Sequence, residues 1–318
     1  MTTDRPLASA TRPMRLPVWP LWSGRVTPMQ LPVEASDPFL MLVHHRHSFS
    51  RWDPVRPFSA FVMPEGFPAH PHRGFETVTY VLDGGMRHRD STGVKMTYKA
   101  GSAQWLTAGR GVLHEEMWDT SQSTHELYQI WVNLPSAHKL DPPEIQLAGP
   151  ADVEDGPGVT RTELTVGEVD GARITVLGGS CRGITSPVRT RSPMTIARLE
   201  WAMPAGFQWD DLPGDHTAIV YVRKGAVDVA GKRVAAGGLG WFAPSRSPGL
   251  RLAALEPGTD VMLLTGQPLR EPIAMGGSMV MNTVAEVDRA HADFQRGGFG
   301  ATWPHSASDA AWRKAIGR

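Results

Sequence analysis

Two pairs of side chains in the first half of the chain have the types and spacing of metal ligands. The first pair is in "HPHRGFETVTYVLDGG", where His70 and His72 flank Pro71 at the start of a β-branched, apolar run. Residues i and i+2 of a strand share a face. Both imidazoles are therefore expected to project to one side, with Pro71 on the other.

The second pair is in "TAGRGVLHEEMW", where His114 and Glu116 are again two residues apart and Glu115 faces the opposite side. Two strands that each offer two ligands could surround one cation with three imidazoles and a carboxylate. Imidazole suits Fe, Zn, Cu and Ni, and an anionic oxygen helps to hold a divalent ion. Four protein ligands on an octahedral ion leave two positions for water, O2 or a chelating substrate.

A single H-x-H motif is more often a surface or core feature than a metal site, so the second pair carries much of the argument. The strand "HRGFETVTY" also places Glu76 on the same face as His70 and His72. It is then a fifth ligand, a hydrogen-bond acceptor for an imidazole N–H, or a solvated residue, and parity does not choose among these.

Strand-like runs dominate the chain, and Gly, Pro, Asp or Asn bounds each of them. This pattern predicts an all-β barrel or sandwich. One helix is expected at about 284–295, because Thr283 and Glu286 form a capping box and Gly297 and Gly298 supply a C-terminal stop. The runs are "FETVTYVL", "SAQWLTAG", "ELYQIWVNL", "RITVLGG", "MTIARLEW", "HTAIVYVRKG", "AVDVAG", "LGWFAP" and "DVMLLTG".

The two halves of the chain resemble each other. "YVLDGG" at Tyr80 is similar to "YVRKGA" at Tyr221, and "AGSAQWL" at Ala100 to "AGGLGWF" at Ala236. The segment 134–161 is rich in Pro, Gly and acidic residues and is expected to be a linker. We therefore predict two tandem barrels, a metal-binding N-terminal domain at 1–140 and a degenerate C-terminal domain with a terminal helix at 141–318.

The repeat also predicts how many metals bind. The offset of the first matching pair places Asp211 and Pro213 opposite His70 and His72. The offset of the second places Leu250 and Leu252 opposite His114 and Glu116. Because the second copy lacks the whole ligand set, one metal per chain is expected, in the N-terminal half.

Composition narrows the class of protein. The chain has 318 residues, and 32 Lys plus Arg balance 32 Asp plus Glu, which argues against direct nucleic-acid binding through global charge. The single cysteine, Cys181, excludes an intrachain disulfide and is expected to be a small buried hydrophobe. The N-terminus has no apolar signal region, and no stretch approaches the roughly 20 apolar residues of a spanning helix. We expect a cytoplasmic protein without a membrane association.

The residues that carry this argument resemble the pirin family, part of the cupin superfamily. The resemblance rests on "HPHRGFETVTYVLDGG", "AGSAQWLTAGRGVLHEEM", "QIWVNLP" and "GQPLREPIAMGGSMVMNT", in order through roughly residues 37 to 295. It implies two cupin barrels facing each other and a C-terminal helix that braces the N-terminal barrel. It also implies one Fe(II) on His70, His72, His114 and Glu116, with Zn, Mn, Ni, Cu or Co as other candidates. Glu76 is a ligand position in many other cupins but not in pirins, so it is placed behind the ligands.

The chain departs from the family pattern at two places. Pirins usually carry an acidic stretch where this chain has "VHHRHSFSRW", with His44, His45 and His47. These histidines could shape the mouth of a pocket or bind a stray metal, and we expect solvated loop residues. Glu115 replaces the small residue common between the last two ligands and is expected to add negative charge near the site.

The resemblance implies two classes of function. One is a flavonol 2,3-dioxygenase, in which a divalent ion binds the 3-hydroxy-4-keto edge of a quercetin-like substrate and favours its enolate. Glu116 accepts the hydroxyl proton if it loosens from the metal, or Glu76 assists. The other is a non-catalytic regulator whose iron oxidation state changes a surface that binds a protein partner. A purely structural metal is a third reading, against which the expected open positions argue.

We favour the enzyme, because an iron with vacant positions is costly to keep unless it binds something. Its substrate would be a small aromatic or chelating molecule, and quercetin itself need not be the natural one. Pocket-wall candidates are Phe39, Met41, Phe49 and Trp52, and Arg46, Arg51 and Arg56 are candidates for a docking patch.

Overall fold

The computed structural model describes residues 5–17, 24–49 and 65–318, and Arg51, Trp52 and Arg56 lie outside them. The chain forms two compact units. We call the unit made of Arg15–Pro28, Met41–Thr162 and Glu271–Arg318 the N-terminal barrel. The unit made of Met1–Met14, Met29–Leu40 and Glu163–Arg270 is the C-terminal barrel.

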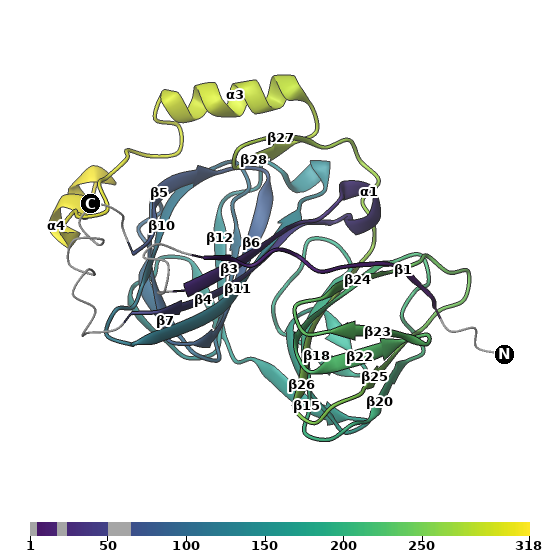
Figure 1. Cartoon of the computed structure of the whole chain (residues 1–318). Coiled ribbons are helices and arrows are strands. Elements are labelled where there is room, and N and C mark those ends of the chain that lie inside the picture. Colours follow the sequence, from purple (N-terminus) through teal and green to yellow (C-terminus); the bar gives the residue numbers. More distant parts are fainter. Residues whose placement is uncertain (1–4, 18–23, 50–64) are drawn as a thin grey trace. The chain divides into compact units, whose positions relative to one another are not determined.

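Two sheets form the N-terminal barrel. One has the strand order β13-β8-β7-β10-β5 and the other the order β14-β12-β9-β6-β11-β4-β3-β2 (Figure 1). The strands are β2 (Leu16–Pro17), β3 (Gly24–Gln30), β4 (Phe39–Ser48), β5 (Gly66–His72), β6 (Phe75–Asp83), β7 (Gly85–Asp90), β8 (Lys95–Lys99), β9 (Ala103–Thr107), β10 (Val112–Trp118), β11 (Thr124–Asn133), β12 (Glu144–Ala148), β13 (Ala151–Asp155) and β14 (Val159–Thr162).

Alternation along the strands decides which side chains enter the N-terminal barrel. Val81 of β6, Leu106 of β9, Trp118 of β10 and Leu127 of β11 are buried together in one apolar cluster. Side chains two residues from these positions lie on the same inward face. Thr79 of β6 and Gln129 of β11 are therefore inward-facing polar residues, and the site described below lies among them.

The C-terminal barrel repeats this strand order. Its β24-β21-β26-β19 correspond to β9-β6-β11-β4, and its β23-β22-β25-β20 to β8-β7-β10-β5, which confirms the tandem all-β barrels expected from the repeat. Cys181 is buried in its apolar core, and burial raises the pKa of the thiol to about 12. Its strands are β1 (Leu7–Thr11), β15 (Thr165–Val169), β16 (Ala172–Gly178), β17 (Ser180–Cys181), β18 (Ile184–Thr185), β19 (Met194–Trp201), β20 (Gly206–Trp209), β21 (Thr217–Lys224), β22 (Ala226–Val229), β23 (Lys232–Ala235), β24 (Leu239–Phe242), β25 (Leu250–Ala254) and β26 (Thr259–Gly266), and the short helix α1 (Val33–Ser36) belongs to the same unit.

The predicted linker at 134–161 is not a separate connection. After the short helix η1 (Ser136–His138), β12 pairs with β9 and β13 pairs with β8 within the N-terminal barrel. The compact units consequently differ from the predicted division after residue 140. β13 has alternating half-buried and exposed positions, so its composition resembles that of a loop although it completes a sheet.

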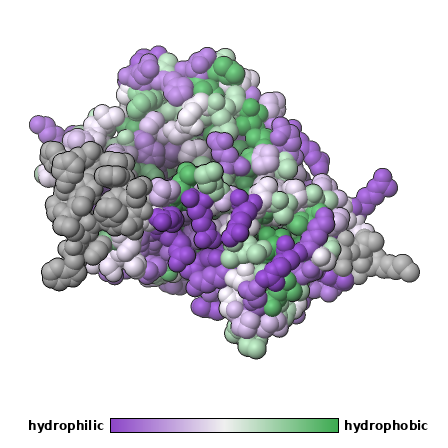
Figure 2. All heavy atoms as spheres, in the orientation of Figure 1, coloured by the Kyte–Doolittle hydropathy of each residue, from purple (hydrophilic) through white to green (hydrophobic). Residues whose placement is uncertain are grey.

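The last part of the chain returns to the N-terminal barrel. It contains β27 (Ala274–Gly276), β28 (Met279–Met281), α3 (Val284–Gln295) and α4 (Asp309–Ala315). The predicted helix is confirmed as α3, with the Thr283–Glu286 capping box, whereas α4 was not predicted. Val287 and Ala290 of α3 pack in one cluster with Met279, Trp312 and Leu113 of β10. The outward face of α3, at the top of Figure 2, is mainly hydrophilic.

Among the described residues, no helix has both the length and the apolar character needed to cross a membrane.

Candidate metal centre

Three imidazoles converge inside the N-terminal barrel. His70 and His72 are on β5, and His114 of β10 is the direct antiparallel partner of His70. The Nε2 atom of His70 lies 3.1 Å from Nε2 of His72 and 3.1 Å from Nε2 of His114. His72 and His114 are buried and His70 is half-buried.

The nitrogen separations fit a bound transition-metal ion. Two nitrogens at about 2.1 Å from one ion are about 3.0 Å apart at the right angle of an octahedron and about 3.4 Å apart in a tetrahedron. The Nδ1 atom of His70 is 2.7 Å from the carbonyl oxygen of Pro68. A carbonyl accepts a proton donor, so Nδ1 carries the proton and Nε2 presents its lone pair to the centre.

The protonation states also suit metal binding. Burial, and next the neighbouring imidazoles, hold the pKa of His72 and of His114 well below the ordinary value. Both rings are therefore neutral at physiological pH, which is the form of histidine that ligates a metal.

Glu116 lies beside this cluster rather than within it. The three imidazoles form one group with ligand atoms within 4.8 Å of one another, and Glu116 belongs to a second group with His114 and His88. Its Oε1 accepts hydrogen bonds from the Tyr98 hydroxyl and from Thr79 Oγ1 at 3.2 Å. Its Oε2 accepts one from Gln129 Nε2 at 2.8 Å. Three donors thus hold the carboxylate next to His114.

His88, which the spacing did not predict, also lies beside the imidazoles. This residue of β7 is the cross-strand partner of Glu116, and Asp90 is that of His114. His88 is completely buried, and its Nε2 is 3.1 Å from Asp90 Oδ2. The segment "MRHRD" carried a signal, because His88 and Asp90 have the same two-residue spacing on a strand as the two predicted pairs.

The expected position of Glu76 is wrong. β5 ends at His72 and β6 begins at Phe75, with Gly74 in a left-handed conformation (φ 82°) between them. This turn resets the alternation. Thr77 and Thr79 consequently share the site-facing side of β6, whereas Glu76 faces the other way and accepts a hydrogen bond from Thr107 Oγ1 at 2.6 Å. Glu76 therefore does not share the face of His70 and His72.

Glu115 does not add charge to the site either. It lies on the outer side of β10, where Arg89 Nε donates to Oε1 at 2.5 Å and the indole Nε1 of Trp303 donates to Oε2 at 2.8 Å. Its charge is compensated on the face that the C-terminal segment covers.

The additional histidines are not solvated loop residues. His44, His45 and His47 are buried on β4. His44 pairs with Glu126 at 2.8 Å. His45 and His47 lie against Trp118, with ring centroids 5.9 and 4.5 Å away. Burial lowers the pKa of His45 to about 3 and that of His47 to about 4.

The interior of the C-terminal barrel is apolar at the corresponding positions. Leu250 and Leu252 of β25 pair with Trp209 and Phe207 of β20, and all four are core residues. Strand pairing makes Trp209 the counterpart of His70, so the predicted counterpart Asp211 is two residues out of register. The expected loss of ligands at Leu250 and Leu252 agrees with this core.

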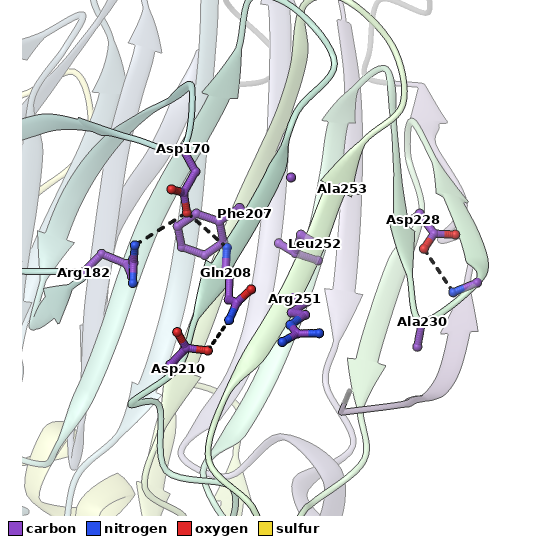
Figure 3. Close-up of a pocket in the computed structure, with 12 residues that line it drawn as sticks. Asp170, Arg182, Phe207, Gln208, Asp210, Asp228, Ala230, Arg251, Leu252 and Ala253 are labelled. Atoms are coloured by element: carbon purple, nitrogen blue, oxygen red, sulfur yellow. Dashed lines mark hydrogen bonds and ion pairs between the residues drawn. The ribbon is translucent and has the colours of Figure 1, made fainter. Parts of the chain in front are cut away.

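A groove of about 660 Å³ lies on the C-terminal barrel (Figure 3). Its carboxylates interact with nearby groups rather than with one another. Asp170 pairs with Arg182 at 3.6 Å, and Asp210 accepts a hydrogen bond from Gln208 Nε2 at 2.5 Å. Asp228 accepts one from the Gly231 amide at 3.0 Å. No histidine or cysteine is among the described residues that line it, so the groove does not offer a transition-metal set.

Fold and site together define a two-barrel cupin whose first barrel has residues that could bind a metal. The Pirin family model matches residues 24–132, and the model of the pirin C-terminal cupin domain matches residues 198–300. The chain belongs to the pirin family.

Relatives cover most of the chain. Pirin-1 of Arabidopsis thaliana is 33% identical over 264 residues, 81% of this chain and 82% of the relative. Human pirin is 34% identical over 259 residues, which cover 79% of this chain and 84% of the human protein. A crystal structure of quercetin 2,3-dioxygenase from Acinetobacter baumannii superposes with a TM-score of 0.75 at 30% identity, covering 94% of this chain and 99% of that one.

Proposed function

We propose that this protein is a metal-dependent dioxygenase that acts on a small, planar, chelating aromatic substrate of the flavonol type. The convergence of three imidazole Nε2 atoms, with His70 Nε2 3.1 Å from each of the other two, carries the proposal. The likeness to a structure titled as a quercetin 2,3-dioxygenase supports the substrate class.

His70, His72 and His114 would hold one divalent ion, and Glu116 would supply the neighbouring carboxylate. We propose Fe(II) as the ion. When bound, such an ion supplies Lewis-acid and O2 chemistry that the side chains alone do not have.

Aromatic side chains beside the imidazoles suit a flat substrate. The ring of Phe75 lies 5.0 Å, and that of Trp131 5.5 Å, from the ring of His72. Trp131 is half-buried, and its contact with the His72 ring is edge-on. Stacking on an aromatic ring positions a planar molecule and keeps water from its surface.

Glu116 is the residue best placed to accept the proton of a substrate hydroxyl. The hydrogen bonds from Tyr98, Thr79 and Gln129 fix the position of its carboxylate. A general base must be held within reach of the proton that it accepts, and these contacts hold Glu116 beside the imidazoles.

The test is O2 consumption by metal-free protein reconstituted anaerobically with Fe(II), with and without quercetin, with the metal content measured on the same samples. The matched variant is His70→Ala with His114→Ala. Turnover in the parent that disappears with the metal in the variant supports the proposal. Full iron occupancy without turnover overturns the enzyme and favours the redox-sensing regulator. A parent without stoichiometric metal overturns the site.

A further inference from the structure

We propose that the outer face of the N-terminal barrel binds a small organic monocarboxylate at Arg87. A cavity of about 400 Å³ lies there, between strands β7, β8 and β10 and the segment that precedes α4. Arg87 and Arg89 alternate with His88 along β7, so their side chains project from the face of the sheet opposite to that of His88. The sheet therefore separates this cavity from the candidate metal centre, and the inference goes beyond the proposed function.

One row of charged side chains at the cavity is already paired. In the strand register, Arg89 of β7 lies between Glu115 of β10 and Lys95 of β8. Arg89 Nε donates to Glu115 Oε1 at 2.5 Å. Lys95 Nζ donates to Glu154 Oε2 at 2.5 Å and to Asp309 Oδ2 at 2.6 Å. The three carboxylates among the described lining residues thus each have a cation within hydrogen-bond distance.

Arg87 is the cation of the next row, and its charge is not paired. Its cross-strand neighbours are Met117 of β10 and Thr97 of β8, which are uncharged, and all three residues line the cavity. Arg87 is exposed, and its guanidinium makes no hydrogen bond or ion pair with any residue in the described part of the chain. A guanidinium presents its N–H donors in a planar fork that fits a carboxylate. Arg87 therefore offers an anion a full positive charge inside a formed cavity.

The segment before α4 forms a fixed wall of the cavity. The carbonyl oxygen of Ala307 accepts a hydrogen bond from Arg89 Nη1 at 3.0 Å, and Asp309 pairs with Lys95. His305 and Ser306 of the same segment also line the cavity, and both are exposed. An imidazole N–H and a hydroxyl are hydrogen-bond donors, so this wall adds two donors to those of Arg87.

The surroundings of Arg87 select the class of ligand. A second negative charge on the ligand would approach the carboxylates of Glu115 and Asp309, so a single charge is favoured. Met117 is half-buried beside Arg87 and gives a hydrocarbon body an apolar surface. The volume lies within the range of about 300–1,000 Å³ that is usual for small-molecule sites. A small aromatic monocarboxylate, with benzoate as the probe, combines these properties.

The experiment is a ligand-observed NMR titration of the full-length protein with benzoate, performed with and without one equivalent of Zn(II). Arg87→Gln should weaken benzoate binding about tenfold or more, because hydrogen bonds between charged groups are among the stronger ones. Arg233→Gln is the matched control, since it makes the same chemical change at an exposed arginine of the C-terminal barrel that pairs with Glu256. It should change the affinity by less than about twofold.

A second variant tests the cavity by filling it. Thr97→Glu places a carboxylate directly across the strand pair from Arg87, so it should pair with the guanidinium and abolish benzoate binding. Inorganic phosphate is titrated in parallel and should bind more weakly than benzoate. Phosphate that binds more tightly would overturn the ligand class. Equal losses in Arg87→Gln and Arg233→Gln, binding that requires Zn(II), or no binding by the parent would overturn the site. Because the titration without metal does not depend on the imidazoles, its outcome is independent of the proposed function.

Discussion

His47 shows how strongly single residues of the N-terminal barrel depend on burial. Its ring stacks on Phe49, with centroids 5.9 Å apart, and lies 4.5 Å from that of Trp118. Burial, and then the charge of His125 when protonated, lowers the pKa of His47 from 6.5 to about 4. The folded state thus keeps this imidazole neutral at pH values where the unfolded chain protonates it.

The free energy of unfolding should therefore decrease as the pH is lowered. Above pH 6.5, His47 is neutral in both the folded and the unfolded state, so it does not lower the free energy of unfolding. Between pH 6.5 and about 4 the unfolded chain binds a proton at His47 and the folded protein does not. By pH 4 this difference has lowered the free energy of unfolding by about 3 kcal/mol. Urea unfolding at several pH values measures this dependence. His47→Phe should reduce the number of protons taken up on unfolding in this pH range by about one, and with it the slope of the free energy of unfolding against pH. An unchanged slope would contradict the buried, neutral state.

Glu116 and Glu76 are a second contrast at the residue scale, because both are buried carboxylates but face opposite sides of their sheets. Glu116→Gln should weaken divalent-metal binding by tenfold or more, since it removes the anionic oxygen beside His114. Glu76→Gln should leave metal affinity unchanged. Metal titrations of the two variants decide this, and an equal loss in both would contradict the assigned faces.

The two-residue spacing predicted which side chains share a face along one continuous strand. It gave the wrong face where a turn separates two strands. His70, His72 and His114 were found because each pair lies on one unbroken strand. Glu76 was misplaced because the turn at Gly74 is not visible as a change of parity. His88 was missed because its contact with Glu116 depends on which strands pair, and parity along one strand does not contain that information.

At the scale of elements, Lys139 joins three segments behind the site. Its Nζ donates to the carbonyl oxygen of Gly74 at 2.9 Å, to Asn133 Oδ1 at 2.7 Å and to the carbonyl oxygen of Val280 at 3.0 Å. It therefore connects the turn between β5 and β6, the end of β11 and strand β28. The ammonium group of Lys139 therefore fixes the turn that directly follows His72.

Lys139→Met should lower the free energy of unfolding by about 2–4 kcal/mol, because it leaves three buried acceptors without a donor. It should also weaken metal binding, since the turn after His72 loses its support. Denaturant unfolding and a metal titration measure the two effects. Lys95→Met, which removes a more exposed lysine bound to Glu154 and Asp309, is the matched control and should cost about 1 kcal/mol or less. A Lys139→Met protein as stable as the control variant would contradict the connection.

Whether a segment forms a helix or a strand was easier to predict than which sheet a strand joins. The capping box of Thr283 and Glu286 and the following glycines predicted α3 from local signals alone. β12 and β13 were assigned to a linker because their segment is rich in Pro, Gly and acidic residues. β13 is an edge strand with no fully buried position, whereas β12 is mostly buried between two strands. Their place in the sheets depends on pairing with β9 and β8, which are far away in the sequence.

At the scale of the whole molecule, the C-terminal segment belongs to the barrel that carries the candidate metal centre. Trp312 of α4 is completely buried in the cluster that contains Leu113, the residue before His114. The guanidinium of Arg89 lies 5.8 Å from the Trp312 ring centroid, and Arg89 also contacts Glu115 of β10. Residues at the end of the chain therefore support the outer side of the strands whose inner side holds the imidazoles.

Trp312→Ala should consequently destabilise the N-terminal barrel and loosen its metal. Removal of a buried tryptophan costs about 3–5 kcal/mol, and the cavity would lie beneath β10. Trp201→Ala removes a tryptophan that is equally buried in the separate core of the C-terminal barrel. Scanning calorimetry of metal-loaded protein, with metal release followed in parallel, should show early release in Trp312→Ala only. Equal release temperatures in the two variants would mean that the C-terminal segment does not support the metal-bearing strands.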